Sequence, residues 1–202
     1  MLAYKFYLVL FALKIATCSC HRDRKEDFRE DAHYKIQKIG KLNSIIDESS
    51  GIIQAGNQTF WTHNDSGGEP ALYRINEKGE LLETRVFPML KNHDWEEITA
   101  DHLGNLFIGD FGNNSQKRTD LCIWKIEGEK EPQAIRFRYE DQKEFPGNPP
   151  NFDCEAFFEH EGFLYLFSKD WSKKKLVSKM YKIPATPGDY SISPIAKQKI
   201  PT

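Results

Sequence analysis

The sequence has few cysteines, little net charge and no long uninterrupted apolar run. Only four of the 202 residues are cysteine, which excludes a cysteine-rich metal site. The formal net charge of −2 provides no bulk attraction to nucleic acid, so we expect no nucleic-acid partner. An amphipathic helical period of useful length is also missing, which argues against a helical fold.

The N-terminal segment is typical of an export signal. Lys5 provides a positive charge, and residues 6–13 form an apolar run of the length found in signal peptides. Lys14 interrupts this run, so the segment is too short and too polar for a permanent membrane anchor. We therefore expect residues 1–20 to direct the chain to the periplasm or the outer cell surface.

The end of this segment resembles the processing site of bacterial lipoproteins. Cys20, preceded by Ser19, fits that pattern better than Cys18, and lipidation there would hold the protein on a membrane surface. Ordinary signal cleavage with incidental cysteines is the alternative. The charged residues 21–40 are predicted to be a solvated tether.

Two cysteines, Cys122 and Cys154, lie in the part of the chain that is expected to fold. Export permits a disulfide between them. They fall at different places in the repeated units described next, so we expect two free, buried thiols.

Aromatic residues and short apolar segments between turns are abundant. Aromatics make up 13% of the chain and suit pleated sheet surfaces. Three segments, which begin at Glu48, Glu96 and Asp153, repeat the same order of acidic residue, strand, turn and strand. The spacing pairs Glu48 with Glu96 and Glu155, at a period of roughly 50 residues. A third and a fourth strand are expected in each unit, at residues 71–75 and 82–87, 122–126 and 134–139, and 179–183 and 195–200.

Four short strands per unit at this period are typical of propeller blades. The sequence therefore predicts an all-β fold, a β-propeller with about three four-stranded blades over residues 41–91, 92–142 and 150–202. Residues 141–150 contain prolines and glycine and are expected to form a loop between blades. Three blades do not close a ring, so we expect either a piece of a longer propeller or half of a ring that a second copy closes.

Four ordered motifs between residues 42 and 184 carry a family resemblance. They are Trp61–Gly67 (WTHNDSG), Asp94–Glu97 (DWEE), Gly109–Asn114 (GDFGNN) and Asp153–Ala156 (DCEA). This series resembles that of a mostly uncharacterised group of exported bacterial β-propeller proteins near the esterase-like phytase propellers. The resemblance implies a propeller that runs on into further blades and says little about activity. Glu97 and Phe157 stand where that family often has Asp and Leu.

Acidic residues precede or begin the first strand of each unit, where a propeller would bring them to one rim of its channel. They are Glu48, Asp94, Glu96, Asp153 and Glu155. Carboxylates repel one another when gathered, so a divalent cation would stabilise them, and calcium suits such oxygen ligands. The predicted metal ligands are Asp94, Glu96, Asp153 and Glu155, and a cationic or hydroxyl-rich ligand is the alternative. Asp65, Asp110 and Asn113 are expected to form or support turns, because Asp and Asn often bond backbone amides at strand ends.

These patterns favour a cell-envelope binding module that recognises an unidentified small molecule, protein or cation at an acidic rim. A metal-dependent, phytase-like phosphoesterase is one alternative, although only Arg74, Arg118 and Lys169 lie near the candidate loops to hold phosphate. A purely structural module is the other alternative, so enzymatic activity stays an open question. Ser66 lacks the strand–turn–helix context of an active serine, so a catalytic triad with His63 is not expected.

Overall fold

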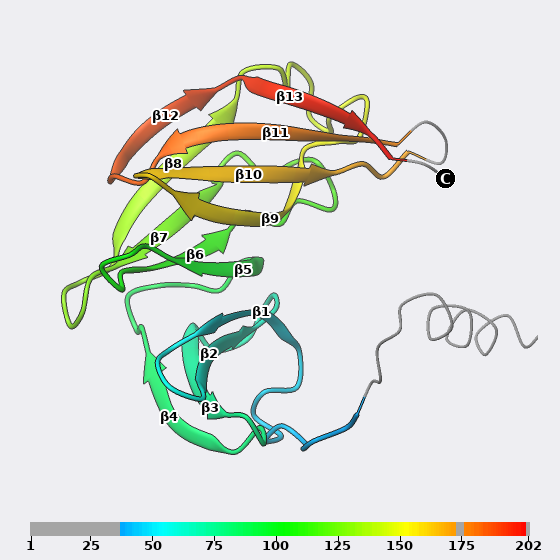
Figure 1. Cartoon of the computed structure of the whole chain (residues 1–202). Coiled ribbons are helices and arrows are strands. Elements are labelled where there is room, and N and C mark those ends of the chain that lie inside the picture. Colours follow the sequence, from blue (N-terminus) through cyan, green and yellow to red (C-terminus); the bar gives the residue numbers. More distant parts are fainter. Residues whose placement is uncertain (1–36, 173–175, 201–202) are drawn as a thin grey trace, which may run out of the picture. The chain divides into compact units, whose positions relative to one another are not determined.

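The structure is a computed structural model that describes residues 37–172 and 176–200, which form thirteen strands in three sheets (Figure 1). The all-β prediction is confirmed, because these residues contain no helix. Accordingly, the described part of the chain has no helix with the length and apolar character needed to cross a membrane. The predicted signal segment 1–20, including Cys20, and most of the tether 21–40 lie outside the described residues.

The first sheet joins four antiparallel strands in chain order. They are β1 (Ser49–Gln54), β2 (Thr59–Asn64), β3 (Ala71–Asn76) and β4 (Leu81–Val86). The second sheet repeats this order with β5 (Trp95–Ala100), β6 (Leu106–Asp110), β7 (Cys122–Ile126) and β8 (Gln133–Tyr139). The third sheet contains β9 (Asp153–His160), β10 (Phe163–Lys169), β11 (Val177–Pro184) and β13 (Pro194–Lys199).

One strand departs from the four-stranded repeat that the sequence predicts. β12 (Gly188–Ile192) pairs in parallel with β8 and becomes a fifth strand of the second sheet. The chain then returns to the third sheet, where β13 pairs with β11. The segment after β11 therefore ties the second and third sheets together through backbone hydrogen bonds.

A glycine with positive φ makes the turn between the first two strands of every sheet. The angles are 119° at Gly56, 83° at Gly104 and 78° at Gly162. L-residues with a side chain rarely adopt these conformations, so each glycine permits a tight hairpin. The three turns follow the Gly-bearing signals that the sequence shows between its apolar runs.

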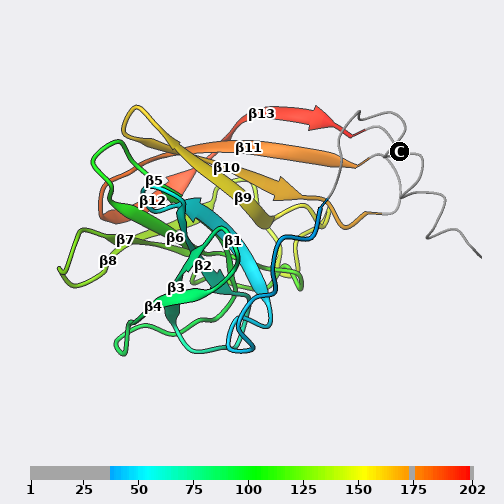
Figure 2. The ribbon, with the colours of Figure 1, turned by 60° about the horizontal axis from the view of Figure 1, so that its bottom comes forward.

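The sheets lie one above another, with the second sheet between the other two (Figures 1 and 2). Its first strand, β5, contacts β1 on one side and β9 on the other. Buried apolar residues fill both interfaces, among them Leu72 and Ile98 between the first and second sheets and Phe107 and Leu166 between the second and third. The three described sheets do not close into a ring.

Both cysteines in the described part of the chain are free and buried, as expected. Burial raises the pKa of the Cys122 thiol to about 12 and that of Cys154 still further. A thiol needs ionisation to act as a nucleophile or metal ligand, so these two residues serve packing.

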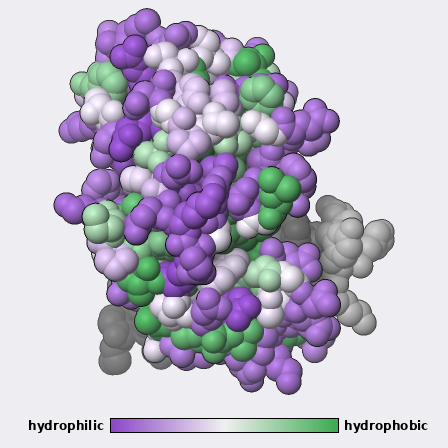
Figure 3. Space-filling model, turned by 90° about the vertical axis from the view of Figure 1, so that its left-hand side faces the viewer, coloured by the Kyte–Doolittle hydropathy of each residue, from purple (hydrophilic) through white to green (hydrophobic). Residues whose placement is uncertain are grey.

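One side of the molecule, where the β7–β8 turn lies, is mainly hydrophilic, and its hydrophobic residues form small scattered groups (Figure 3). Exposed apolar residues of this kind are common on protein surfaces. This side therefore gives no indication of a binding surface. The polar residues that do indicate one lie near the starts of the first strands of the sheets, β1, β5 and β9.

Candidate functional site

The first strands of the three sheets each contain a β-bulge near their beginning. The pairing register shifts between Ser49 and Ile52 in β1 and between Trp95 and Glu97 in β5. In the third sheet it shifts opposite Phe167 and Ser168, which leaves an extra residue in β9. A bulge turns the side chain of the extra residue away from the regular alternation, and bulges often lie next to functional sites.

Aligning the strands at their bulges gives the equivalent positions of the three repeats. Glu96 and Glu155 occupy the bulges of β5 and β9, and Ser50 occupies that of β1. The residues that precede them by two positions are Glu48, Asp94 and Asp153. Glu48 is therefore equivalent to Asp94, whereas the sequence spacing had paired it with Glu96, two positions further along the repeat.

Five carboxylates gather at the starts of these strands. Asp65, Asp94 and Glu96 form one group, and Glu96, Asp153 and Glu155 form another. Within each group one oxygen per residue lies within 4.8 Å of the others. Since Glu96 belongs to both groups, the two are neighbours, and we call the five residues the carboxylate cluster. All four predicted metal ligands belong to it.

Glu48 does not join the carboxylate cluster within the described part of the chain. Its side chain is exposed, and its backbone carbonyl accepts a hydrogen bond from the Asp65 amide (2.9 Å). The equivalent bulge residue, Ser50, donates its hydroxyl to the Glu96 carbonyl (2.6 Å). The first repeat thus contributes Asp65, from the end of β2, rather than Glu48.

Asp65 is the residue of the cluster that the sequence assigned to a turn. Its carboxylate does accept a hydrogen bond from the Ser66 amide (2.6 Å), as a turn-forming aspartate would. Asn92 holds the same loop by donating to the Asp65 carbonyl (2.5 Å). Asp65 therefore both forms a turn and belongs to the carboxylate cluster. In the sequence, the only signal for its second role is its position directly after β2.

Asp153 is held in place by two donors. The Asn113 amide donates to Oδ1 (2.6 Å), and the indole of Trp171 donates to Oδ2 (2.6 Å). Asn113 in turn accepts hydrogen bonds from the amides of Lys117 and Arg118 with its side-chain oxygen. This chain of contacts fixes the loop after β6 against the start of β9.

Gly112 lies against the carboxylates and leaves room for them. A Cβ atom at this position would overlap the Glu96 carboxylate and the carboxyl group of Asp94. The Gly112 amide also donates to the Asp94 carbonyl (3.1 Å). Gly112, in the motif Gly109–Asn114, thus brings the two acidic residues together in two ways. It has no side chain to fill the space of their carboxyl groups, and its amide holds the backbone of Asp94.

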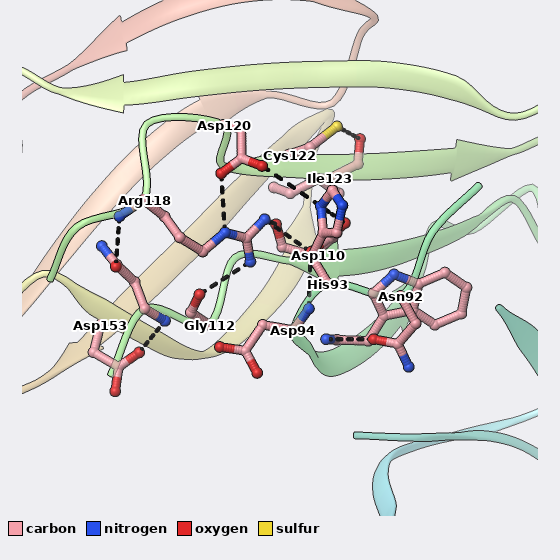
Figure 4. A network of polar contacts seen from close by, with 12 residues as sticks. Asn92, His93, Asp94, Asp110, Gly112, Arg118, Asp120, Cys122, Ile123 and Asp153 are labelled. Atoms are coloured by element: carbon pink, nitrogen blue, oxygen red, sulfur yellow. Dashed lines mark hydrogen bonds and ion pairs between the residues drawn. The ribbon is translucent and has the colours of Figure 1, made fainter. Parts of the chain in front are cut away.

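Arg118 stabilises the loop behind the cluster (Figure 4). Its guanidinium pairs with the buried Asp110 (3.0 Å) and with Asp120 (3.0 Å), and it donates to the Gly112 carbonyl (3.0 Å). Asp110 also accepts a hydrogen bond from the Asp94 amide (3.2 Å). Asp110 and Asn113 therefore support the site through the backbone and do not belong to the carboxylate cluster.

The pKa values of the cluster indicate negative charge that the protein compensates poorly. Burial, together with the charges of Glu155, Asp65, Asp94 and Asp153, raises the pKa of Glu96 to about 8. Burial raises the pKa of Asp94, with further contributions from neighbouring carboxylates. Burial also raises the pKa of Asp153 to about 6, against the lowering effect of its two donors. A bound cation would lower all three.

Among the residues that the structure describes, Lys169 is the basic residue that forms an ion pair with the carboxylate cluster. Its Nζ donates to Glu155 Oε1 (2.8 Å) and lies 4.1 Å from the ring centroid of Trp171. Within residues 37–172 and 176–200, this one ammonium group beside five carboxylates leaves a net negative charge. Arg118 pairs with Asp110, and Arg74 pairs with Glu83 (2.8 Å), so the three basic residues that the sequence singled out are all engaged with carboxylates.

His63 is not arranged for catalysis. Its ring is buried, packs edge-on against Trp95 (5.8 Å between centroids), and has Nδ1 3.0 Å from the Asn64 carbonyl. Burial lowers the pKa of His63, so the ring is neutral at physiological pH. This agrees with the expectation that no Ser–His–Asp triad exists here.

Comparisons with known proteins give no family assignment, because no family model and no curated protein sequence matches the chain. The carboxylate cluster is therefore the feature of the molecule that indicates a function.

Proposed function

We propose that the protein is a propeller-type binding module that holds a divalent cation, with calcium as the preferred ion, at the carboxylate cluster. The proposal is based on the two sets of three acidic residues that share Glu96. In each set, one carboxylate oxygen per residue lies within 4.8 Å of the others. Calcium accepts six to eight oxygen ligands at flexible geometry. The carboxylates of the cluster come from three sheets, and their raised pKa values show that they repel one another when no cation is bound. A bound cation would offset this repulsion.

The propeller interpretation is supported by the repeat of the sheets. Each sheet begins with a bulged inner strand, and β1, β5 and β9 lie next to one another as inner strands around a propeller axis do. The likeness of the sequence motifs to exported bacterial propellers points the same way. We accordingly propose that the module works at the cell envelope, lipid-anchored through Cys20.

The phosphoesterase alternative has less support from the geometry. A site that cleaves phosphate esters needs basic groups to hold the phosphate as well as a metal ion. Arg74 and Arg118 are committed to other carboxylates, and Lys169 is paired with Glu155. We therefore favour cation binding, and through the bound cation recognition of a ligand that offers oxygen atoms.

The proposal is tested by calorimetric titration of the chelator-treated protein with calcium and, separately, magnesium. We expect heat on calcium addition, a higher unfolding temperature in calcium, and loss of both effects in Glu96→Gln. Glu144→Gln is the matched control, because this exposed glutamate lies outside the cluster and the substitution removes the same charge. Wild-type protein that shows neither heat nor a stability gain would contradict the proposal.

A further inference from the structure

A cavity of about 320 Å³ lies between the first and second sheets, at the ends of the strands where the hairpin turns lie. Apart from Gln54 and Arg85, its lining consists of glycine and apolar residues. The side chains that matter most for its chemistry are those of Trp61 and Arg85 from the first sheet and of Ala100, Leu106 and Ile126 from the second. Its volume and composition are those of a small-molecule site, which is typically apolar with few polar groups.

The cavity and the carboxylate cluster lie at opposite ends of the same strands. Glu96 occupies the bulge near the start of β5, and Ala100 is the last residue of that strand. A strand rises about 3.3 Å per residue, so about 13 Å separates the two positions. The cavity is therefore distinct from the proposed cation site.

Small residues keep this space open. Ala100 has only a methyl group, whereas the equivalent residue of the third sheet is Glu159. An added Cβ at Gly128, in the β7–β8 turn, would have no atom within 4 Å. Trp61 is consequently only partly buried, while its equivalent in the second sheet, Phe107, is 0% exposed in the core shared with the third sheet.

Arg85 places a positive charge where the second sheet has an apolar residue. In the pairing register it is equivalent to Ile135, which is 0% exposed. Arg85 is half-buried, and its guanidinium donates to the Gly128 carbonyl and lies 5.1 Å from the ring centroid of Phe87. Both partners are uncharged, so neither offsets the charge of the guanidinium.

Arg85 forms no ion pair with any residue in the described part of the chain. Glu83, two residues earlier on the same face of β4, is paired with Arg74 instead (2.8 Å). A charge that is partly removed from water gains from a partner of opposite sign. A carboxylate that enters the cavity would supply this partner.

We propose that the cavity binds a small hydrophobic carboxylate, an aromatic carboxylic acid of one or two rings. The ring packs against Trp61 and the aliphatic side chains of the second sheet, and the carboxylate pairs with Arg85. An apolar cavity of about 150 Å³ holds benzene. The volume between these two sheets therefore accommodates two fused rings and a carboxylate.

The two ends of the cavity favour this ligand over others. Inorganic phosphate would pair with Arg85 but would leave the apolar walls without a contact. A neutral hydrocarbon would fill the walls and leave the guanidinium unpaired. A planar carboxylate matches the fork of the guanidinium, and a flat ring matches the broad surface of Trp61.

The test is a calorimetric titration of the full chain with naphthoate and, separately, with naphthamide, its neutral isostere. Arg85→Met should weaken naphthoate binding at least about tenfold, since it removes the charged partner of the carboxylate, and should leave naphthamide binding unchanged. Arg136→Met is the matched control, because this exposed arginine also lacks an ion pair with the described residues and does not line the cavity. Its affinity for naphthoate should equal that of wild type.

Ala100→Leu tests the location of the site. The larger side chain extends into the cavity, so this variant should bind neither compound while its circular dichroism spectrum stays that of wild type. If Ala100→Leu does not fold, an NMR titration of wild type locates the ligand. Naphthoate should shift the indole signal of Trp61, which lines the cavity, and leave that of Trp171 in place.

Three results would overturn the proposal. They are the absence of naphthoate binding by wild type at millimolar concentration, unchanged binding by folded Ala100→Leu, and equal affinities of Arg85→Met and Arg136→Met for naphthoate. All titrations are carried out in chelator. Binding at this cavity needs no cation, so its failure and the failure of the proposed cation site are separate results.

Discussion

Replacing Glu96 with glutamine is expected to stabilise the calcium-free protein at alkaline pH. The Glu96 carboxyl has a pKa of about 8 in the folded protein, against an ordinary value of 4.5. Between these values the folded protein holds a proton that the unfolded chain has released. Stability from this group therefore falls as the pH rises from 4.5 to 8, and it stays low above that. Glutamine has no charge to lose, so the variant avoids this penalty.

The size of the effect follows from the pKa of Glu96. A rise from 4.5 to about 8 corresponds to about 5 kcal/mol when taken at its full value. Glu96 is only half-buried, and screening by solvent reduces the expected gain to roughly 2 kcal/mol. At pH 4.5 and below the carboxyl is protonated in the folded protein, so the two proteins should differ little there.

Urea denaturation in the presence of chelator, at pH 4.5 and pH 9, measures the difference directly. The midpoint of Glu96→Gln should exceed that of wild type at pH 9 and approach it at pH 4.5, while Glu144→Gln should follow wild type at both. Adding calcium at pH 9 should reverse the order, because wild type gains an ion and the variant loses a ligand. If the variant is no more stable than wild type at pH 9 without calcium, then burial and the neighbouring carboxylates do not destabilise the ionised Glu96, and the reasoning is refuted.

Three further predictions concern residues around the cluster. Gly112→Ala should weaken calcium binding and lower the unfolding temperature, because its Cβ overlaps Glu96 and Asp94, whereas Gly68→Ala, whose Cβ would lie 3.7 Å from its nearest neighbour, should change neither. Arg118→Met should cost about 3 kcal/mol in urea denaturation, since it leaves the buried Asp110 without its partner, and an unchanged midpoint would contradict that role. Lys169→Met should tighten calcium binding in calorimetry by removing the ammonium that competes for Glu155, and weaker binding would show that Lys169 supports the site instead.

The strands of the three sheets are largely predictable because their pairings are local. A hairpin such as β9–β10 consists of alternating apolar residues around Glu161 and Gly162, and both strands and turn lie within one short stretch. The same holds for the aromatic residues of the third strands, Tyr73, Trp124 and Tyr181, which occupy equivalent places in the register.

β12 could not be predicted in this way. Its sequence, Gly188–Ile192, is short and lies between two prolines, which is typical of a turn. It becomes a strand only because β8, some 50 residues earlier in the chain, offers a parallel edge, and no local pattern records such a pairing.

The members of the carboxylate cluster could be predicted in part, because most of them belong to a local pattern. Asp94, Glu96, Asp153 and Glu155 were recognisable because each pair precedes or begins a strand in a repeated unit. The place of Glu48 in the repeat could not be predicted, because it depends on where the bulges of β1 and β5 lie. Spacing along the chain does not locate a bulge. Asp65 belongs to a different strand end, so only the fold brings it to the cluster.

The most direct test of the cation site is a crystal structure of the protein grown with calcium. We predict an ion bound by Glu96 together with oxygens of Asp94, Asp153 or Glu155, at distances of about 2.3–2.6 Å. Anomalous scattering would distinguish the ion from water. A cluster without an ion at saturating calcium, with Lys169 still paired to Glu155, would contradict the proposed function.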